Sequence, residues 1–273
     1  MNINEHSHHT PGTEQHLTQW IIPQLILALP FVILLCMYIL AALRSSRNKP
    51  WPLYRTVIWL IGNILAVAAL AGPLAALAHT NFIAHMLSHL LLGMLAPLLM
   101  VMAAPMTLLL GMLSIPLAKR LTRIMRSWPL RMLTHPMITS SLNIGGLWLL
   151  YTTNLYSLMH ESILLYLIVH FHLFAAGYLF TVSIIYIDPV HHRYSYMYRS
   201  IVLVISLAGH GVLSKIIYAH PPAGIPLDQA TLGSMLMYYG GDAIDIMLMF
   251  TLCMHWFRST RPRTDLTMRK STI

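Results

Sequence analysis

Seven long apolar stretches constrain this chain more than any other feature of its sequence. Each contains about the 20 apolar residues that a helix needs to cross a bilayer, and 57% of the 273 residues are hydrophobic while 9% are charged. Backbone in lipid must satisfy its own hydrogen bonds, so such stretches predict helices. The sequence therefore predicts an all-α integral membrane protein, a seven-transmembrane-helix bundle with spans at Trp20–Leu43, Thr56–Ala78, Phe82–Met112, Pro136–Thr153, Ser162–Ile187, Ser200–Ala219 and Ser234–Phe257.

The third stretch, Phe82–Met112, is too long for one straight crossing. Pro97 and Pro105 lie inside it, and proline cannot donate the backbone hydrogen bond that a helix interior requires. We expect both prolines to kink this helix and its end to leave the membrane.

Lysine and arginine gather on one side of the predicted bundle. They follow the first, third, fifth and seventh stretches, whereas the opposite connections contain none and only Lys215 lies near the other face. This positive-inside pattern predicts an outer amino terminus and a cytoplasmic carboxyl terminus. We expect residues 1–19 to form an outer tail containing histidines, residues 20–257 the membrane domain, and residues 258–273 a basic cytoplasmic tail. The net charge of +9 lies at the spans and their flanks, which argues against nucleic acid as a partner.

Histidine and aspartate occur inside four of the apolar stretches. Counted at about 1.5 Å per residue, they lie roughly 10 to 15 Å below the same predicted outer face. Polar groups are costly in hydrocarbon and are usually retained there for a site. Imidazole and carboxylate are metal ligands, so we predict one metal site built from His85, His89, His170, His210, Asp242 and Asp245.

Helical spacing refines this prediction. His85 and His89 are four residues apart and project from one helix face. His172 points away from His170, so we expect it outside the site. Asp242 is the expected ligand at the depth of the histidines, with Asp245 acting behind it. The two carboxylates could instead orient a ligating histidine or relay protons, and a structural ion pair with Lys215 is the rival interpretation.

The chain resembles the integral-membrane CtaG family of cytochrome c oxidase assembly factors, which is associated with caa-type oxidases. The resemblance spans most of residues 56–257. It is carried by HMLSHLLLGMLAPLLMVMAAPMTLLL at His85–Leu110, the HP pair at His135–Pro136, HFHLFAAGYLF at His170–Phe180, and DQATLGSMLMYYGGD at Asp228–Asp242. One departure is Tyr238, which stands where family members often have tryptophan.

The resemblance implies a multi-pass protein of the bacterial plasma membrane that is needed to assemble the oxidase. By motif it implies roles for His85, His89, His170 and Asp228. We therefore predict an assembly factor, not an enzyme, that binds copper at an outward-facing site and aids its delivery. Its expected partners are oxidase subunits, copper donor proteins and the lipid bilayer.

Three other functions fit the same residues. Three histidines could hold Zn²⁺, with an aspartate as base, in a membrane hydrolase. His170 and His210 could be the axial ligands of haem b in a redox protein. A proton or metal transporter would use Asp242 and Asp245 as relays.

Overall fold

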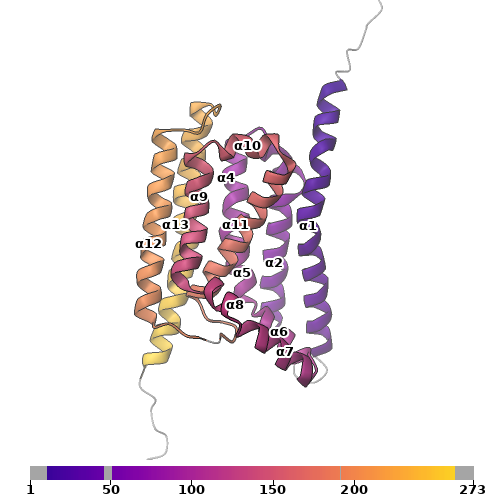
Figure 1. Ribbon diagram of the computed structural model, residues 1–273, viewed down its shortest axis with the longest axis vertical. Coiled ribbons are helices and arrows are strands. Elements are labelled where there is room, and N and C mark those ends of the chain that lie inside the picture. Colours follow the sequence, from indigo (N-terminus) through magenta and orange to yellow (C-terminus); the bar gives the residue numbers. More distant parts are fainter. Residues whose placement is uncertain (1–10, 46–50, 191, 262–273) are drawn as a thin grey trace, which may run out of the picture.

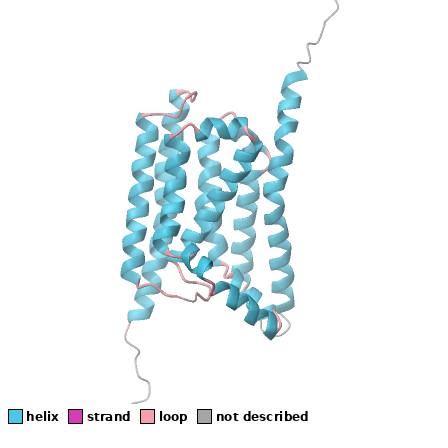
Figure 2. Cartoon of the chain, in the orientation of Figure 1, coloured by secondary structure: helices cyan, strands magenta, loops and turns pink. Residues whose placement is uncertain are grey.

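The chain folds into a bundle of helices that stand side by side (Figures 1 and 2). The computed structural model describes residues 11–45, 51–190 and 192–261, and this part of the chain contains helices and no strands. The helices are α1 Pro11–Ser45, α2 Leu53–Leu70, α3 Pro73–Ala78, α4 Phe82–Leu90, the π-helix η1 Leu91–Leu95, α5 Ala96–Met102, α6 Pro105–Met112, α7 Ile115–Met125, α8 Trp128–Leu133, α9 Pro136–Thr152, α10 Leu155–Glu161, α11 Ile163–Ile184, α12 Tyr196–Ala219 and α13 Leu227–Thr260.

Six helical segments of the described chain are long and apolar enough to cross a membrane. They are Trp20–Ser45, Leu53–Leu70, Phe82–Met102, Ile163–Ile184, Tyr196–Ala219 and Leu227–Thr260. The fourth predicted span corresponds to α9, which has 17 residues and packs against α11 and α12. The predicted outer tail is helical from Pro11 onward, while residues 1–10 and most of the basic tail lie outside the described residues.

The segment formed by α4, η1 and α5 lies at the centre of the bundle. Of the residues in its most apolar window, 61% are buried, whereas the corresponding share for α1, at the edge in Figure 1, is 17%. The segment packs against α2, α11 and α13. His85 and His89 are therefore carried by the most enclosed helix. Figure 1 shows α10 at one end of the bundle and α7 and α8 at the other, which we call the α10 end and the α7 end.

Two predicted spans are wrong in their extent, and in both cases the backbone gives the reason. The helix expected over Thr56–Ala78 stops at Leu70, because Gly72 adopts a φ of +91° and Pro73 starts a new helix. The helix expected over Phe82–Met112 ends at Met102. There Ala104 is left-handed with a φ of 54°, and Pro105 begins α6. The expected interruptions at Pro97 and Pro105 thus occur, as a π-helical turn before the first and a break at the second.

A backbone-to-backbone contact joins this central segment to α11. A Cβ atom placed on Gly177 would lie 1.9 Å from the carbonyl oxygen of Gly93, so only glycine fits there. In a regular α-helix the Gly93 carbonyl would accept from residue 97, but Pro97 has no N–H. The close approach fixes the distance between the helix that carries His85 and His89 and the helix that carries His170.

Candidate functional site: two polar pockets

Five of the six residues predicted to form one site line two separate pockets, and the sixth, Asp242, lines neither. His85 and His170 border one near the α10 end, and His89, His210 and Asp245 border another deeper in the bundle. We call the first the four-histidine cluster, because His79 and His160 complete it, and the second the central cavity. Among the described residues, no group of three or more His, Cys, Asp or Glu side chains is arranged so that it could hold a metal ion.

The four-histidine cluster brings four imidazoles and one thioether around a cavity of about 10 Å³. His79 caps α3, His85 lies on α4, His160 on α10 and His170 on α11, with Met159 beside them. The ring centroid of His160 lies 5.9 Å from that of His79 and 6.2 Å from that of His85. The short connections before α4 and α11 bring these residues together at one end of the bundle.

Hydrogen bonds to the backbone fix which ring nitrogens are free. Nδ1 of His160 lies 2.9 Å from the carbonyl oxygen of Tyr156, and Nδ1 of His170 lies 2.9 Å from that of Tyr166. A carbonyl oxygen only accepts, so in both rings Nδ1 carries the proton and Nε2 keeps a lone pair. A bond of this kind is what orients a metal-binding histidine. The remaining predicted member, His85, places Nε2 3.0 Å from the hydroxyl of Tyr151.

A larger hollow leads to this cluster. It has a volume of about 610 Å³ and is lined by residues of α1, including Trp20 and Gln24, and by the α2–α3 region. His79 and His160 line both this hollow and the small cavity. Burial, and then the neighbouring His160, lower the pKa of His79 to about 4, so this ring is neutral at pH 7. The hollow thus opens onto the uncharged imidazole of His79.

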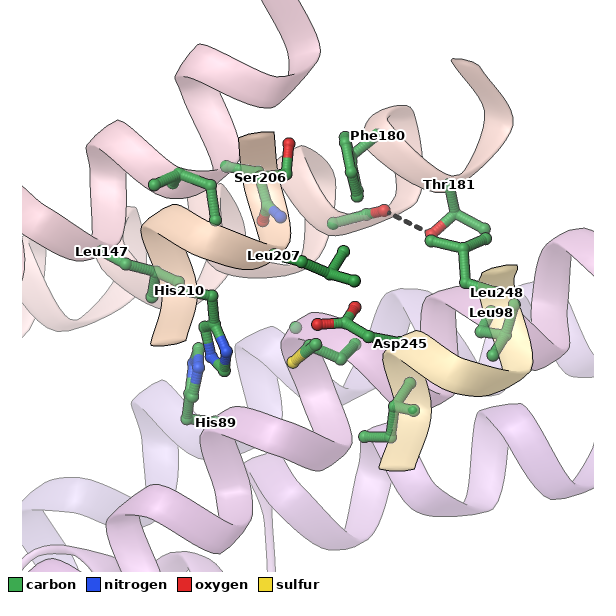
Figure 3. A pocket seen from close by; sticks show the side chains of 16 residues that line it. His89, Leu98, Leu147, Phe180, Thr181, Ser206, Leu207, His210, Asp245 and Leu248 are labelled. Atoms are coloured by element: carbon green, nitrogen blue, oxygen red, sulfur yellow. Dashed lines mark hydrogen bonds between the residues drawn. The ribbon is translucent and has the colours of Figure 1, made fainter. Parts of the chain in front are cut away.

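The central cavity lies between the central segment of α4, η1 and α5 and helices α9, α11, α12 and α13, and it has a volume of about 30 Å³ (Figure 3). The rings of His89 and His210 lie side by side, with centroids 6.2 Å apart and planes inclined by 29°. The Asp245 carboxyl points into the same space. Exposed fractions are 2% for His89, 3% for His210 and 5% for Asp245.

Three ring nitrogens at this cavity have no hydrogen-bond partner. They are both nitrogens of His89 and Nε2 of His210. The His210 ring is held tightly, because a Cβ atom on Gly241 would lie 2.3 Å from its Cε1 atom. Gly93 and Gly177 line the other side of the cavity. A larger residue at Gly177 would collide with the Gly93 backbone, and one at Gly241 would collide with the His210 ring.

The two aspartates differ in burial, and which of them acts as a ligand stays a prediction. Asp245 is the buried carboxyl that lines the cavity, whereas Asp242 is half-buried and does not line it. Lys215, the expected ion-pair partner, is exposed, and its Nζ lies 5.3 Å from the ring centroid of Tyr238. Asp228 is exposed in the first turn of α13, away from both pockets.

Sequence reasoning missed His79 and His160 as site residues. His79 follows α3 and His160 lies just before α11, in short connections at the same predicted face. Their shared position at that face is the sequence feature that could have identified them. His172 lies outside both pockets, as predicted, with Nε2 3.1 Å from the Leu142 carbonyl oxygen. The two histidines of the predicted haem pair, His170 and His210, line different cavities.

The fold and its pockets define a class of protein: a multi-pass helical membrane protein with buried imidazole groups. Residues 36–259 match the family described as cytochrome c oxidase caa3 assembly factor, and the chain belongs to this family.

Three curated relatives are similar over part of their length. An uncharacterized protein of Mycobacterium leprae (strain TN) is 29% identical over 203 residues, which are 69% of this chain and 30% of that protein. Uncharacterized proteins of Mycobacterium bovis and Mycobacterium tuberculosis are each 30% identical over 169 residues, which are 57% of this chain and 24% of theirs. The chain thus spans less than a third of the length of these relatives. No solved structure matches the chain.

Proposed function

We propose that the protein assists the assembly of a cytochrome c oxidase in the bacterial plasma membrane by holding a copper ion at the four-histidine cluster. The observation that carries this proposal is the convergence of four imidazoles and the Met159 thioether beside an accessible hollow. Family membership supports the assembly role. The copper ion is cargo here, so the protein is a carrier and not an enzyme, and its partners are a copper donor and an oxidase subunit.

The ligand chemistry favours monovalent copper. Imidazole and thioether are neutral ligands that suit Cu(I), and no carboxylate lines the small cavity. The cost of burying an ion rises with the square of its charge, so an uncharged ligand set holds a monovalent ion more readily than a divalent one. The free Nε2 lone pairs of His160 and His170 are the first ligands we assign.

We further propose seven spans, with the α10 end outside. Helix α9, about 25 Å long at 1.5 Å per residue, adds a span to the six long apolar helices and is the fourth in chain order. It is shorter than an average bilayer core, but it packs between α11 and α12 inside the bundle. The basic residues Arg44, Arg123 and Arg258 lie in helix turns at or near the α7 end. Positive charge favours the cytoplasmic side, so the hollow opens outward.

A copper competition assay tests the copper site. The purified full-length protein is titrated with Cu(I) against a chromogenic chelator, comparing wild type with the double variant His85→Gln and His170→Gln. We expect the double variant to lose one bound Cu(I) and to lower oxidase activity in cells. The matched control is His172→Gln, which removes a histidine of α11 that lines neither pocket. Equal Cu(I) stoichiometry in the double variant and the control would contradict the proposal.

A further inference from the structure

Helices α7 and α8 connect α6 to α9 at the α7 end of the bundle, and none of their residues is buried. Figure 1 shows α7 at this end, oblique to the long helices. Its main packing partner among the described helices is α8. The proposed function makes no use of residues 114–134, which we call the α7–α8 segment.

Helix α7 has an apolar face and a basic face. Leu117, Leu121 and Ile124 are three or four residues apart and therefore share one side of the helix. Lys119 and Arg123 are also four apart, and at 3.6 residues per turn they lie about 150° away from the apolar group. A helix with two such faces is typical of one that lies in the interface of a membrane.

Large apolar side chains of the α7–α8 segment are not covered by the described part of the chain. The exposed fractions are 49% for Leu117, 58% for Ile124 and 71% for Trp128 at the start of α8. Tryptophan favours the headgroup level of a bilayer. Six helices of the same bundle are long and apolar enough to cross a membrane, so the apolar phase beside their ends is lipid.

The charges of the segment are of one sign. Five cationic residues and no acidic residue occur between positions 114 and 134, and all five are exposed: Lys119, Arg120, Arg123, Arg126 and Arg131. Each Lys or Arg near an anionic membrane surface strengthens binding about fivefold. A partner protein would need an acidic surface beside an apolar groove to match both faces of α7, whereas an anionic bilayer offers both along its whole interface.

We infer that the α7–α8 segment is a recognition surface for anionic phospholipid, with its apolar side chains among the acyl chains and its cationic side chains on the phosphate groups. Guanidinium binds phosphate through two parallel hydrogen bonds, so Arg120 and Arg123 are the headgroup ligands we assign first. The inference goes beyond copper handling. It rests on the proposed orientation only for the leaflet concerned, which is the cytoplasmic one.

Quenching of Trp128 fluorescence by brominated phospholipid measures this preference. The full-length protein is reconstituted at low salt into phosphatidylcholine vesicles that contain an equal minor share of brominated phosphatidylglycerol, which is anionic, or of brominated phosphatidylcholine. The Trp128 signal is the difference between wild type and Trp128→Phe. We expect both lipids to quench it and the anionic one to bind at least about fivefold more tightly. Arg120→Gln combined with Arg123→Gln should reduce that preference about fivefold or more, and added salt should reduce it too.

The matched control removes the same charge elsewhere at the same end of the bundle. Arg258→Gln combined with Arg261→Gln changes two exposed arginines at the end of α13, and we expect it to keep the wild-type preference. Equal loss of preference in this control would overturn the inference, by assigning the effect to net charge.

Two results for wild type would also overturn the inference. Equal binding of the two brominated lipids would show that the segment does not distinguish headgroups. A Trp128 signal that neither lipid quenches would show that protein, not lipid, covers the segment. The test is independent of the copper proposal, because the segment lies at the end of the bundle opposite the four-histidine cluster (Figure 1). We therefore expect the Arg120 and Arg123 variant to bind Cu(I) as wild type does.

Discussion

Replacing Gly177 by alanine tests whether the contact between α11 and the central segment holds the bundle together. The added Cβ would lie 1.9 Å from the Gly93 carbonyl oxygen, whereas an ordinary contact needs at least 3.4 Å. The two helices must separate by about 1.5 Å, because the obstacle is backbone and cannot rotate away. Overpacking in a core costs about 1–3 kcal/mol, and a backbone obstacle places this variant at the upper end.

The assay is thermal unfolding of the detergent-purified protein, followed by tryptophan fluorescence. A loss of about 3 kcal/mol corresponds to a fall in Tm of roughly 6–12 °C for a chain of this size. The matched control is Gly145→Ala, since a Cβ there meets nothing within 4 Å and alanine favours a helix by up to about 1 kcal/mol. We expect the control to match or exceed the wild-type Tm. Equal Tm values for the two variants would refute the role of the contact.

Two further predictions concern the pH response and a helix cap. Burial lowers the pKa of His79 from 6.5 to about 4, so the folded state binds fewer protons than the unfolded state between these values. The Tm should therefore be constant above pH 6.5 and fall as the pH drops toward 4. His79→Gln should flatten that fall, and an unchanged slope would contradict the assignment. Asp188 accepts hydrogen bonds from the backbone N–H groups of Met106 and Thr107, at 3.1 and 2.7 Å, and thereby caps α6. Asp188→Ala should cost about 1 kcal/mol and speed hydrogen exchange across α6; exchange at the wild-type rate would show that the cap is dispensable.

Apolar length predicted where the helices lie, because a bilayer fixes the length of a spanning helix. Apolar length alone could not predict where they break. Pro105 indicated the break that begins α6, but not the left-handed backbone conformation that Ala104 adopts before it. The stop at Leu70 was more accessible, since Gly72 and Pro73 together are a turn signal in the sequence. The error at Leu70 extended a helix through the residue pair that ends it.

The candidate site shows what depth along a helix leaves undetermined. His89, His170 and His210 were placed in one site because they share a depth, but depth does not give the rotation of each helix about its axis. His170 faces the α10 end of the bundle, while the other two face the central cavity. Likewise, Asp242 and Asp245 project only about 60° apart around α13, so spacing alone could not decide which one is buried. The packing of α13 against α4 and α12, which lie far from each other in the sequence, determines that Asp245 is the buried one.

Helix α1 links access to the four-histidine cluster with the thickness of the surrounding lipid. Its apolar segment Trp20–Ser45 is about 39 Å long at 1.5 Å per residue, longer than the roughly 30 Å hydrocarbon core. Because only 17% of its apolar window is buried against the protein, lipid sets its tilt more than the neighbouring helices do. Trp20 and Gln24 on this helix form one wall of the hollow that leads to His79 and His160. A thinner bilayer tilts α1 further and moves that wall, so we expect the membrane itself to set the width of the hollow.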